Sequence, residues 1–314
     1  MAKFCSNCGT KLDDNSEFCT NCGTKVNNPN LPIGGNQKGN IKISNFIGDN
    51  DNIKVVDKQG PFKVIEFEKD LSVTPSESMI KYFSSKMNVR PRQLVVDLSK
   101  TSGIYLQAGA MQWMSGSNKL STGIKGVGDF GKKFLKSAVT GETTVKPEYS
   151  GDGYRVTEQT YKHLILLNLK HFDNNLMIDD GLFLAAEKSI DLAVKARTNL
   201  SSAIAAAEGL FNTVLSGDGY VCLESNIPLK ELIIIEMENE TVSIDGPMAI
   251  AWTSTLELTV ERSGKSLVGS ALSGEGLVNV YRGTGKILMA PLTGRLKYRD
   301  LPQSDKSIMK ELIR

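Results

Sequence analysis

The chain has 314 residues, of which 40% are hydrophobic, and this suffices for a small module together with one large or two medium domains. Its 37 Lys and Arg against 35 Asp and Glu give a net charge of +2, which argues against nucleic-acid binding by a general electrostatic field. Apolar runs are far shorter than the roughly 18 to 20 residues of a membrane span, and no hydrophobic targeting segment is recognised. We therefore expect a soluble protein of the reducing cytoplasm.

Four cysteines near the start form two pairs, Cys5-x-x-Cys8 and Cys19-x-x-Cys22, and a glycine follows each pair. Such knuckles aim four thiolates at one point, which is the ligand set of a closed, structural zinc site. A redox pair would need a nearby βαβ unit, and two disulfides would need an oxidising compartment. We therefore predict a structural Zn²⁺ on these cysteines that folds residues 1–26 as a zinc ribbon, because the module has too few apolar residues to fold alone.

Residues 27–44 are rich in Asn, Gly and Pro and lack periodicity, so we expect a flexible linker there. The rest of the chain, from 45 to 300, is typical of a mainly β domain built as a sandwich or closed barrel, followed by a C-terminal tail at 301–314. The expected strands are Lys63–Glu68, Gln93–Leu98, Tyr105–Met114, Tyr154–Thr157, Leu164–Leu169, Phe183–Val194, Tyr220–Glu224, Leu232–Met237, Ile250–Val260, Leu277–Tyr281 and Lys286–Met289.

A helix is expected after Thr74-Pro75-Ser76-Glu77, which combines a capping threonine, an early proline and a returning glutamate. Apolar residues then recur on one helical face, namely Met79, Ile80, Phe83 and Met87. Pro91 predicts the end of this helix.

Residues 118–139 combine recurring apolar positions with a cluster of cations. The candidate contact residues are Lys119, Lys125, Lys132, Lys133, Phe134 and Lys136. As a helix, this segment would be a cationic amphipath able to lie on an anionic membrane surface. Its four glycines weaken such a helix by roughly 1 kcal/mol each, so we expect it to be ordered by a contact. That contact is a membrane, a protein partner or the chain's own β domain.

The chain also repeats itself. Ser150–Tyr154 recurs at Ser216–Tyr220, an offset of 66 positions, and a shorter copy begins at Ser273. The same offset relates Ala185 to Ala251 without a gap. We therefore predict stacked β units that share a core, since one such unit could not bury its own apolar face.

The sequence GEGLVNVYRGTGKILMAP at Gly274–Pro291, with Asp180–Ala185 and Ala251-Trp252 upstream, resembles the "altered inheritance of mitochondria" family. The resemblance covers roughly residues 45–300 and implies a double-stranded β-helix that assembles into symmetric oligomers. Mitochondrial members of the family are associated with inner-membrane organisation. The family has no established catalytic residues, so none is carried over, and the N-terminal ribbon is a separate module.

A metal-dependent oxygenase on such a fold would need two histidines and a carboxylate at one ion. The chain has only His163 and His171, and a strand between them would hold them roughly 26 Å apart. We therefore expect a non-enzymatic, oligomeric scaffold that presents zinc ribbons to a protein partner. The alternatives are peripheral membrane binding through residues 118–139 and, less favoured, nucleic-acid binding.

Overall fold

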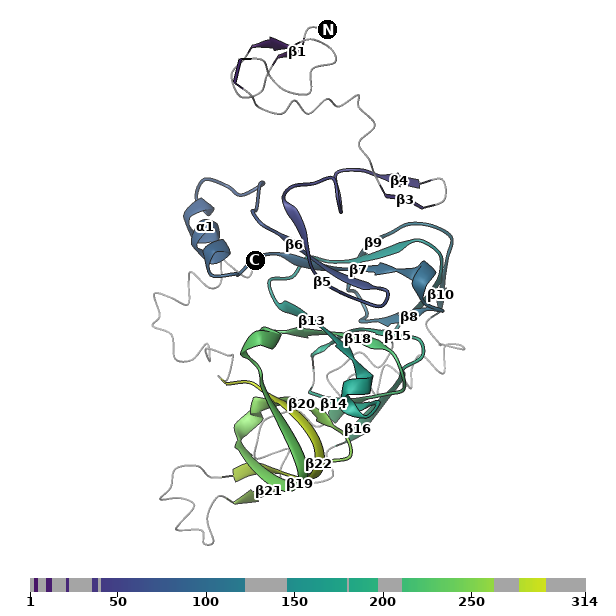
Figure 1. Ribbon diagram of the computed structural model, residues 1–314, viewed down its shortest axis with the longest axis vertical. Helices are drawn as coiled ribbons and strands as arrows, with labels where there is room; N and C mark the ends of the chain where they lie inside the picture. The colour runs from purple at the N-terminus through teal and green to yellow at the C-terminus, as the bar shows by residue number, and fades with distance from the viewer. Residues whose placement is uncertain are drawn as a thin grey trace. The chain divides into compact units, whose positions relative to one another are not determined.

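The computed structural model describes residues 3–4, 10–12, 21–22, 36–38, 41–121, 146–179, 181–196, 211–262 and 277–291. The chain divides into two compact units, Met1–Ile53 and Lys54–Arg314 (Figure 1). The structure is mainly β, as predicted, and one α-helix occurs among the residues described.

The first unit contains two small antiparallel sheets. β1 (Lys3–Phe4) pairs with β2 (Lys11–Leu12), and β3 (Asn36–Lys38) pairs with β4 (Ile41–Ile43). The second pair lies within the segment expected to be a linker, so part of that segment has regular structure.

The second unit is built on three sheets. In spatial order, the strands of the first sheet are β5 (Ile53–Gln59), β6 (Phe62–Phe67), β7 (Arg92–Asp97), β12 (Tyr154–Thr157) and β9 (Met111–Met114). Those of the middle sheet are β10 (Asn118–Ser121), β11 (Glu148–Gly151), β8 (Ile104–Leu106), β15 (Phe183–Glu187), β18 (Tyr220–Ser225) and β13 (His163–Asn168). Those of the third sheet are β16 (Asp191–Ala196), β17 (Phe211–Ser216), β14 (Asn175–Ile178), β20 (Ala249–Thr253), β22 (Leu277–Met289) and β19 (Ile233–Asp245), and β21 (Glu257–Arg262) also pairs with β22.

Both faces of the middle sheet are buried. Leu164 and Leu166 of β13 belong to the core shared with the first sheet, where they join Phe62. Ile165 and Leu167 belong to the core shared with the third sheet. Because successive side chains of a strand point to opposite faces, a strand covered on both sides needs an unbroken apolar run. This explains why no polar residue interrupts Leu164–Leu167.

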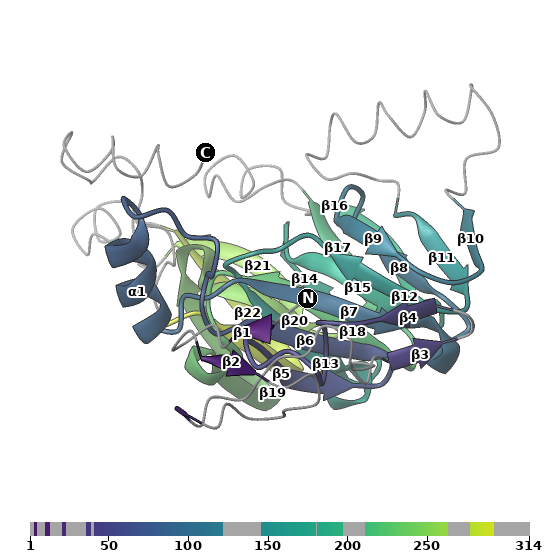
Figure 2. The ribbon, with the colours of Figure 1, turned by 90° about the horizontal axis from the view of Figure 1, so that it is seen from above.

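The third sheet curves around a further core of its own (Figures 1 and 2). The rings of Trp252 and Tyr281 meet edge to face at 5.4 Å in this core. β22 bends at Gly283 and Gly285, whose φ angles are positive, and the register with β19 shifts opposite them. The two strands expected at 277–281 and 286–289 are therefore one bent strand, because the glycines bend the ladder without ending it.

Three segments expected as single strands are each two strands. Tyr105–Met114 contributes β8 to the middle sheet and β9 to the first, and Phe183–Val194 contributes β15 to the middle sheet and β16 to the third. Ile250–Val260 forms β20 and β21, which pair with opposite ends of β22. Short turns divide the segments at residues 107–110, 188–190 and 254–256. Strand-forming residues resume directly after each short turn, so the sequence pattern was read as one strand.

The two copies of Ser-Gly-Asp-Gly-Tyr lie at equivalent corners. Ser150–Tyr154 joins β11 of the middle sheet to β12 of the first, and Ser216–Tyr220 joins β17 of the third sheet to β18 of the middle. The carbonyl of the second glycine accepts a backbone hydrogen bond at each corner, from Leu98 at Gly153 and from Leu169 at Gly219. These donors begin the 3₁₀ helices η1 (Leu98–Lys100) and η2 (Leu169–Phe172). The shared geometry favours the predicted repeat.

Gly153 is the position in these corners where a side chain is least tolerable. Its φ is +100°, and an added Cβ would lie 2.0 Å from the carbonyl oxygen of Ser115. Gly153→Ala should therefore lower the free energy of unfolding by about 3 kcal/mol in urea denaturation. Gly109 also has a positive φ but has open space around it, so Gly109→Ala should cost only about 1 kcal/mol. Equal losses in the two variants would contradict this explanation.

The helix is confirmed, but it begins later than expected. α1 spans Ser78–Lys86, and Glu77 occupies the N-cap position without a capping side-chain hydrogen bond. Thr74 instead donates to the carboxylate of Glu77 at 3.2 Å, so these residues form a turn before the helix. The described residues also include the 3₁₀ helices η3 (Leu229–Glu231) and η4 (Gly246–Met248).

Candidate metal centre and candidate contact surfaces

The first cysteine pair is flanked by two short strands, β1 and β2, which pair with each other. Phe4 of β1 pairs with Lys11 of β2, and Cys5 and Cys8 fall between these two strands in the sequence. The Asn21 side chain donates a hydrogen bond to the Thr10 hydroxyl at 3.1 Å. This bond joins the turn that contains Cys22 to the residue just before β2. The hydrogen bond thus brings a residue adjacent to one cysteine pair close to the strands that flank the other.

The four cysteines fit a structural zinc site in ligand chemistry, since four thiolates suit zinc and leave no position for water. Cys22 is exposed in its turn, whereas Cys5, Cys8 and Cys19 lie outside the described residues. The described part of the chain contains no group of three or more His, Cys, Asp or Glu that could hold a metal elsewhere.

The fifth cysteine, Cys222, is a buried core residue, as its apolar surroundings predict. It lies on β18 with no exposed surface, and burial raises the pKa of its thiol well above the ordinary value. A thiol held in the protonated form is a poor nucleophile and a poor metal ligand. Cys222 is therefore a residue of the core between the first and middle sheets.

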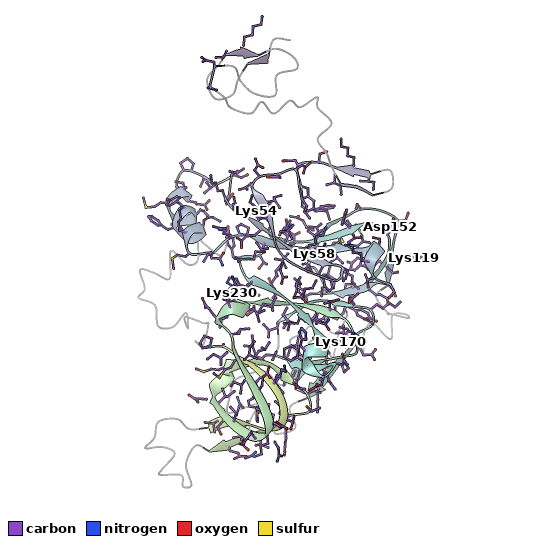
Figure 3. All side chains as sticks on the ribbon, viewed as in Figure 1. Lys54, Lys58, Lys119, Asp152, Lys170 and Lys230 are labelled. Carbon is purple, nitrogen blue, oxygen red and sulfur yellow. The ribbon has the colours of Figure 1, made fainter. Side chains whose placement is uncertain are left out.

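The cationic segment begins as a strand. Asn118–Ser121 forms β10 at the edge of the middle sheet, where Ser121 pairs with Glu148 of β11. A helix over residues 118–139 is therefore wrong for its first four residues. Lys119 is exposed and lies near Asp152 at this edge (Figure 3), whereas Lys125, Lys132, Lys133, Phe134 and Lys136 lie outside the described residues. The β10–β11 pairing places Ser121 and Glu148, the residues that flank 122–147, side by side at this edge.

The exposed lysines Lys54 and Lys58 lie on β5, while Lys170 and Lys230 lie on η2 and η3 (Figure 3). Acidic partners are close to several described cations, for example Asp218 at 3.1 Å from Lys170. This scatter differs from the clustered basic track that phosphate backbones require.

The two histidines lie at opposite ends of the β13–η2 segment, as expected. His163 begins β13 and is partly buried, whereas His171 is exposed in η2. Burial and, secondarily, the charge of Arg92 lower the pKa of His163, while Glu231 and Glu66 oppose the shift. His163 is therefore held neutral in the folded protein near neutral pH.

This lowered pKa predicts a pH dependence of stability. Below the ordinary histidine pKa of 6.5, the unfolded chain binds a proton that folded His163 does not. The free energy of unfolding should therefore fall as the pH drops below about 6.5, toward the folded pKa. Urea denaturation at several pH values should show a smaller fall in His163→Gln, with the wild-type fall retained in His171→Gln. The same fall in both variants would exclude His163 as the cause.

A buried ion network, which the sequence did not predict, anchors the chain after α1. Glu66 on β6 and Arg92 on β7 are directly paired across the strands, and their charged atoms lie 2.7 Å apart. Arg90 contacts the other carboxylate oxygen at 2.9 Å. Arg92 also donates to the carbonyl of Asn88, which follows α1. Charges at adjacent strand positions are common on surfaces, so nothing in the sequence marked this pair as buried.

An enzyme would need a cavity that brings reactive groups together. A cavity of about 300 Å³ is lined by residues that include Thr157, Glu158, Thr160, Leu184 and Glu224. Glu224 is engaged at 3.3 Å by Lys162. Neither histidine, nor Cys222, lines this cavity. Its two carboxylates have no strongly nucleophilic side chain beside them in the lining.

Comparisons with known proteins match the N-terminal segment and the β-rich remainder of the chain separately. A family described as Mitochondrial biogenesis AIM24 matches residues 85–292, and a zinc-ribbon domain matches residues 4–26. An uncharacterized protein of Streptococcus pyogenes serotype M6 is 28% identical over 222 residues, which is 67% of this chain and 86% of that protein. A crystal structure of a Streptococcus pyogenes protein covers 73% of this chain and 96% of its own, at 22% identity and a TM-score of 0.48.

Proposed function

The chain belongs to the Mitochondrial biogenesis AIM24 family and carries a zinc-ribbon domain, and from this we propose that it is a non-enzymatic scaffold. In this proposal, Cys5, Cys8, Cys19 and Cys22 bind a structural Zn²⁺, and the ribbon that they fold binds a protein partner. The second unit, Lys54–Arg314, which we call the β unit, assembles with other copies in the cytoplasm, so that several ribbons act together and gain avidity.

The observation that carries the proposal is the division into two compact units. The ribbon segment belongs to the first unit, whereas the three packed cores belong almost entirely to the second. A small contact module joined in one chain to a well-packed base is the arrangement that multivalent binding needs. Residues 4–26 thus supply recognition, and the sheets supply the base.

Sedimentation equilibrium tests the assembly. We expect the full chain to sediment as a defined oligomer at micromolar concentration, and a monomer there would overturn this part of the proposal. Affinity capture from cell extract, with the full chain and with Cys19→Ser as baits, tests the ribbon. Partners should be lost with the variant, and their retention by both baits would show that the ribbon does not bind them.

A second candidate function is peripheral membrane binding, which the β10–β11 pairing favours. Because Ser121 and Glu148, which flank residues 122–147, lie side by side at one sheet edge, this cationic segment can approach a surface without disturbing the sheet. Among the helices that the structure describes, none is long and apolar enough to cross a membrane. Contact with lipid would therefore be at the surface, through anionic headgroups.

Vesicle flotation with and without phosphatidylserine distinguishes this candidate. We expect binding to anionic vesicles to be lost when Lys125, Lys132, Lys133 and Lys136 are replaced by glutamine. The matched control replaces four exposed lysines elsewhere, namely Lys54, Lys58, Lys170 and Lys230. Equal losses would attribute binding to overall charge, and indifference to phosphatidylserine would reject the candidate.

A further inference from the structure

The apolar side of α1 faces solvent. Met79, Phe83 and Met87, which the helical pattern places on one face, are 71%, 61% and 77% exposed. Ile80 and Tyr82 are also exposed, and α1 has no buried residue. Large exposed apolar patches mark interaction sites, because burying each such side chain stabilises a contact by roughly 1.5–3 kcal/mol. A cover over this face would therefore be stabilising.

Polar contacts fix this orientation. The Ser85 hydroxyl donates to the carbonyl of Glu68 at 3.0 Å, and Arg90 donates to the carbonyl of Ser85 at 3.2 Å. Lys81 binds the Tyr161 hydroxyl and lies 3.6 Å from Asp70, and both contacts raise its pKa. The polar side of α1 is thus held against the protein, and the apolar side cannot turn inward without breaking these bonds.

The chain leaves the third sheet on the side of the molecule where α1 lies. Met289, near the end of β22, pairs with Ile233, which follows η3. Glu231 of η3 acts electrostatically on His163, as does Arg92, which is bonded to Asn88 just after α1. Figure 1 likewise shows the yellow end of β22 on the side of the second unit where α1 lies. Leu229, Ile233 and Ile234, on η3 and β19, are exposed apolar residues as well.

Residues 304–314 have the pattern needed to cover such a surface. Ile308, Met309, Leu312 and Ile313 fall on one stripe of a helix, with Lys310, Glu311 and Arg314 outside it. Asp305 also falls on this stripe, at the N-terminal end of the segment, and Lys306 borders it. A helix of this length is marginal in water and needs a packing surface. The twelve residues 292–303 can reach up to about 40 Å when extended, which is ample for one side of a domain.

We propose that residues 304–314 dock as an amphipathic helix on the apolar side of α1 in the same chain. The stripe of Ile308, Met309, Leu312 and Ile313 then covers Met79, Phe83 and Met87. Both elements gain from the contact, since the segment acquires the surface that its helix needs and α1 loses its exposed apolar face. The contact is independent of the zinc ribbon and of the scaffold function.

Site-specific photo-crosslinking tests the contact in the full chain. p-Benzoylphenylalanine in place of Phe83 should give crosslinked peptides that join position 83 to residues 304–314. The matched control carries the same group in place of Val194, an exposed apolar residue on β16, and should not crosslink to that segment. Mixing isotopically light and heavy chains identifies the source. Crosslinks between light and heavy chains, to another segment or to another molecule would overturn the proposal.

Hydrogen exchange supplies a second, independent test. Leu312→Glu together with Ile313→Glu should raise amide exchange in residues 78–89 and increase dye binding to exposed apolar surface several-fold. Lys310→Gln, which lies outside the stripe, should leave both unchanged. An unchanged urea transition of the β unit establishes that the variants are folded. Exchange in residues 78–89 that matches the unmutated protein would refute the docking.

Discussion

Replacing Cys19 with serine is expected to unfold residues 4–26 and release one zinc per chain, while the β unit keeps its unfolding temperature. Structural zinc contributes about 10–16 kcal/mol to the folding of such modules, far more than a core of a few apolar side chains can offset. The units are separately compact, so loss of the ribbon should not spread to the sheets. Zinc release measured with a chromogenic chelator, together with NMR spectra of the full chain, checks both parts.

The fifth cysteine provides the control for this experiment. Cys222→Ala removes a thiol that is buried on β18 and should leave the zinc content unchanged. A strong chelator should reproduce the effect of Cys19→Ser on the unmutated chain. Full zinc content in Cys19→Ser, or an equal loss in Cys222→Ala, would show that the metal is bound elsewhere.

Glu66→Gln should lower the free energy of unfolding of the β unit by about 3 kcal/mol, the lower end of the range for breaking a buried ion pair. The change keeps the side-chain shape but leaves Arg92, which is 3% exposed, with an uncompensated charge. Arg92 would retain carbonyl acceptors, including Asn88 and Arg90, which is why we expect the lower end. Urea denaturation followed by tryptophan fluorescence measures the loss.

The matched control is a glutamate in an exposed pair. Glu236 lies 2.9 Å from Lys286 on neighbouring strands, with its side chain 67% exposed. Exposed pairs contribute about 0–1 kcal/mol, so Glu236→Gln should change stability within that range. If Glu66→Gln lowered the free energy of unfolding by no more than Glu236→Gln does, burial of the Glu66–Arg92 pair would have no energetic consequence.

Sequence patterns identified strands well where an element had both a continuous apolar run and clear turns at its ends. Leu164–Leu169 was expected and is β13, shifted by one residue. Asn175–Ile178 and Phe211–Ser216 were missed, although they form β14 and β17, because neither combines a continuous apolar run with clear turns at both ends. Turns inside Tyr105–Met114 and Phe183–Val194 were missed because each turn is short and strand-forming residues resume directly after it.

Among the candidate sites, those set by local spacing could be predicted, whereas those that depend on the tertiary fold could not. The zinc ribbon could be predicted because the spacing of its cysteines within a short segment is typical of zinc ligands. The comparison at residues 4–26 confirms that domain. The position of Glu66 beside Arg92 depends on strand register, which a single sequence specifies poorly. The periodicity of Met79, Phe83 and Met87 predicted a helix correctly, but periodicity alone cannot tell which surface covers an apolar face.

The middle sheet has a consequence for how the β unit can come apart. Leu166 and Ile165 are adjacent on one strand but serve different cores, so peeling away either outer sheet would turn one row of β13 side chains to water. Neither outer layer can melt first without weakening the strands that support the other. The middle sheet forms one sandwich with the first sheet and another with the third. These two sandwiches should therefore unfold in a single cooperative transition, and a chain shortened to one of them should not fold by itself.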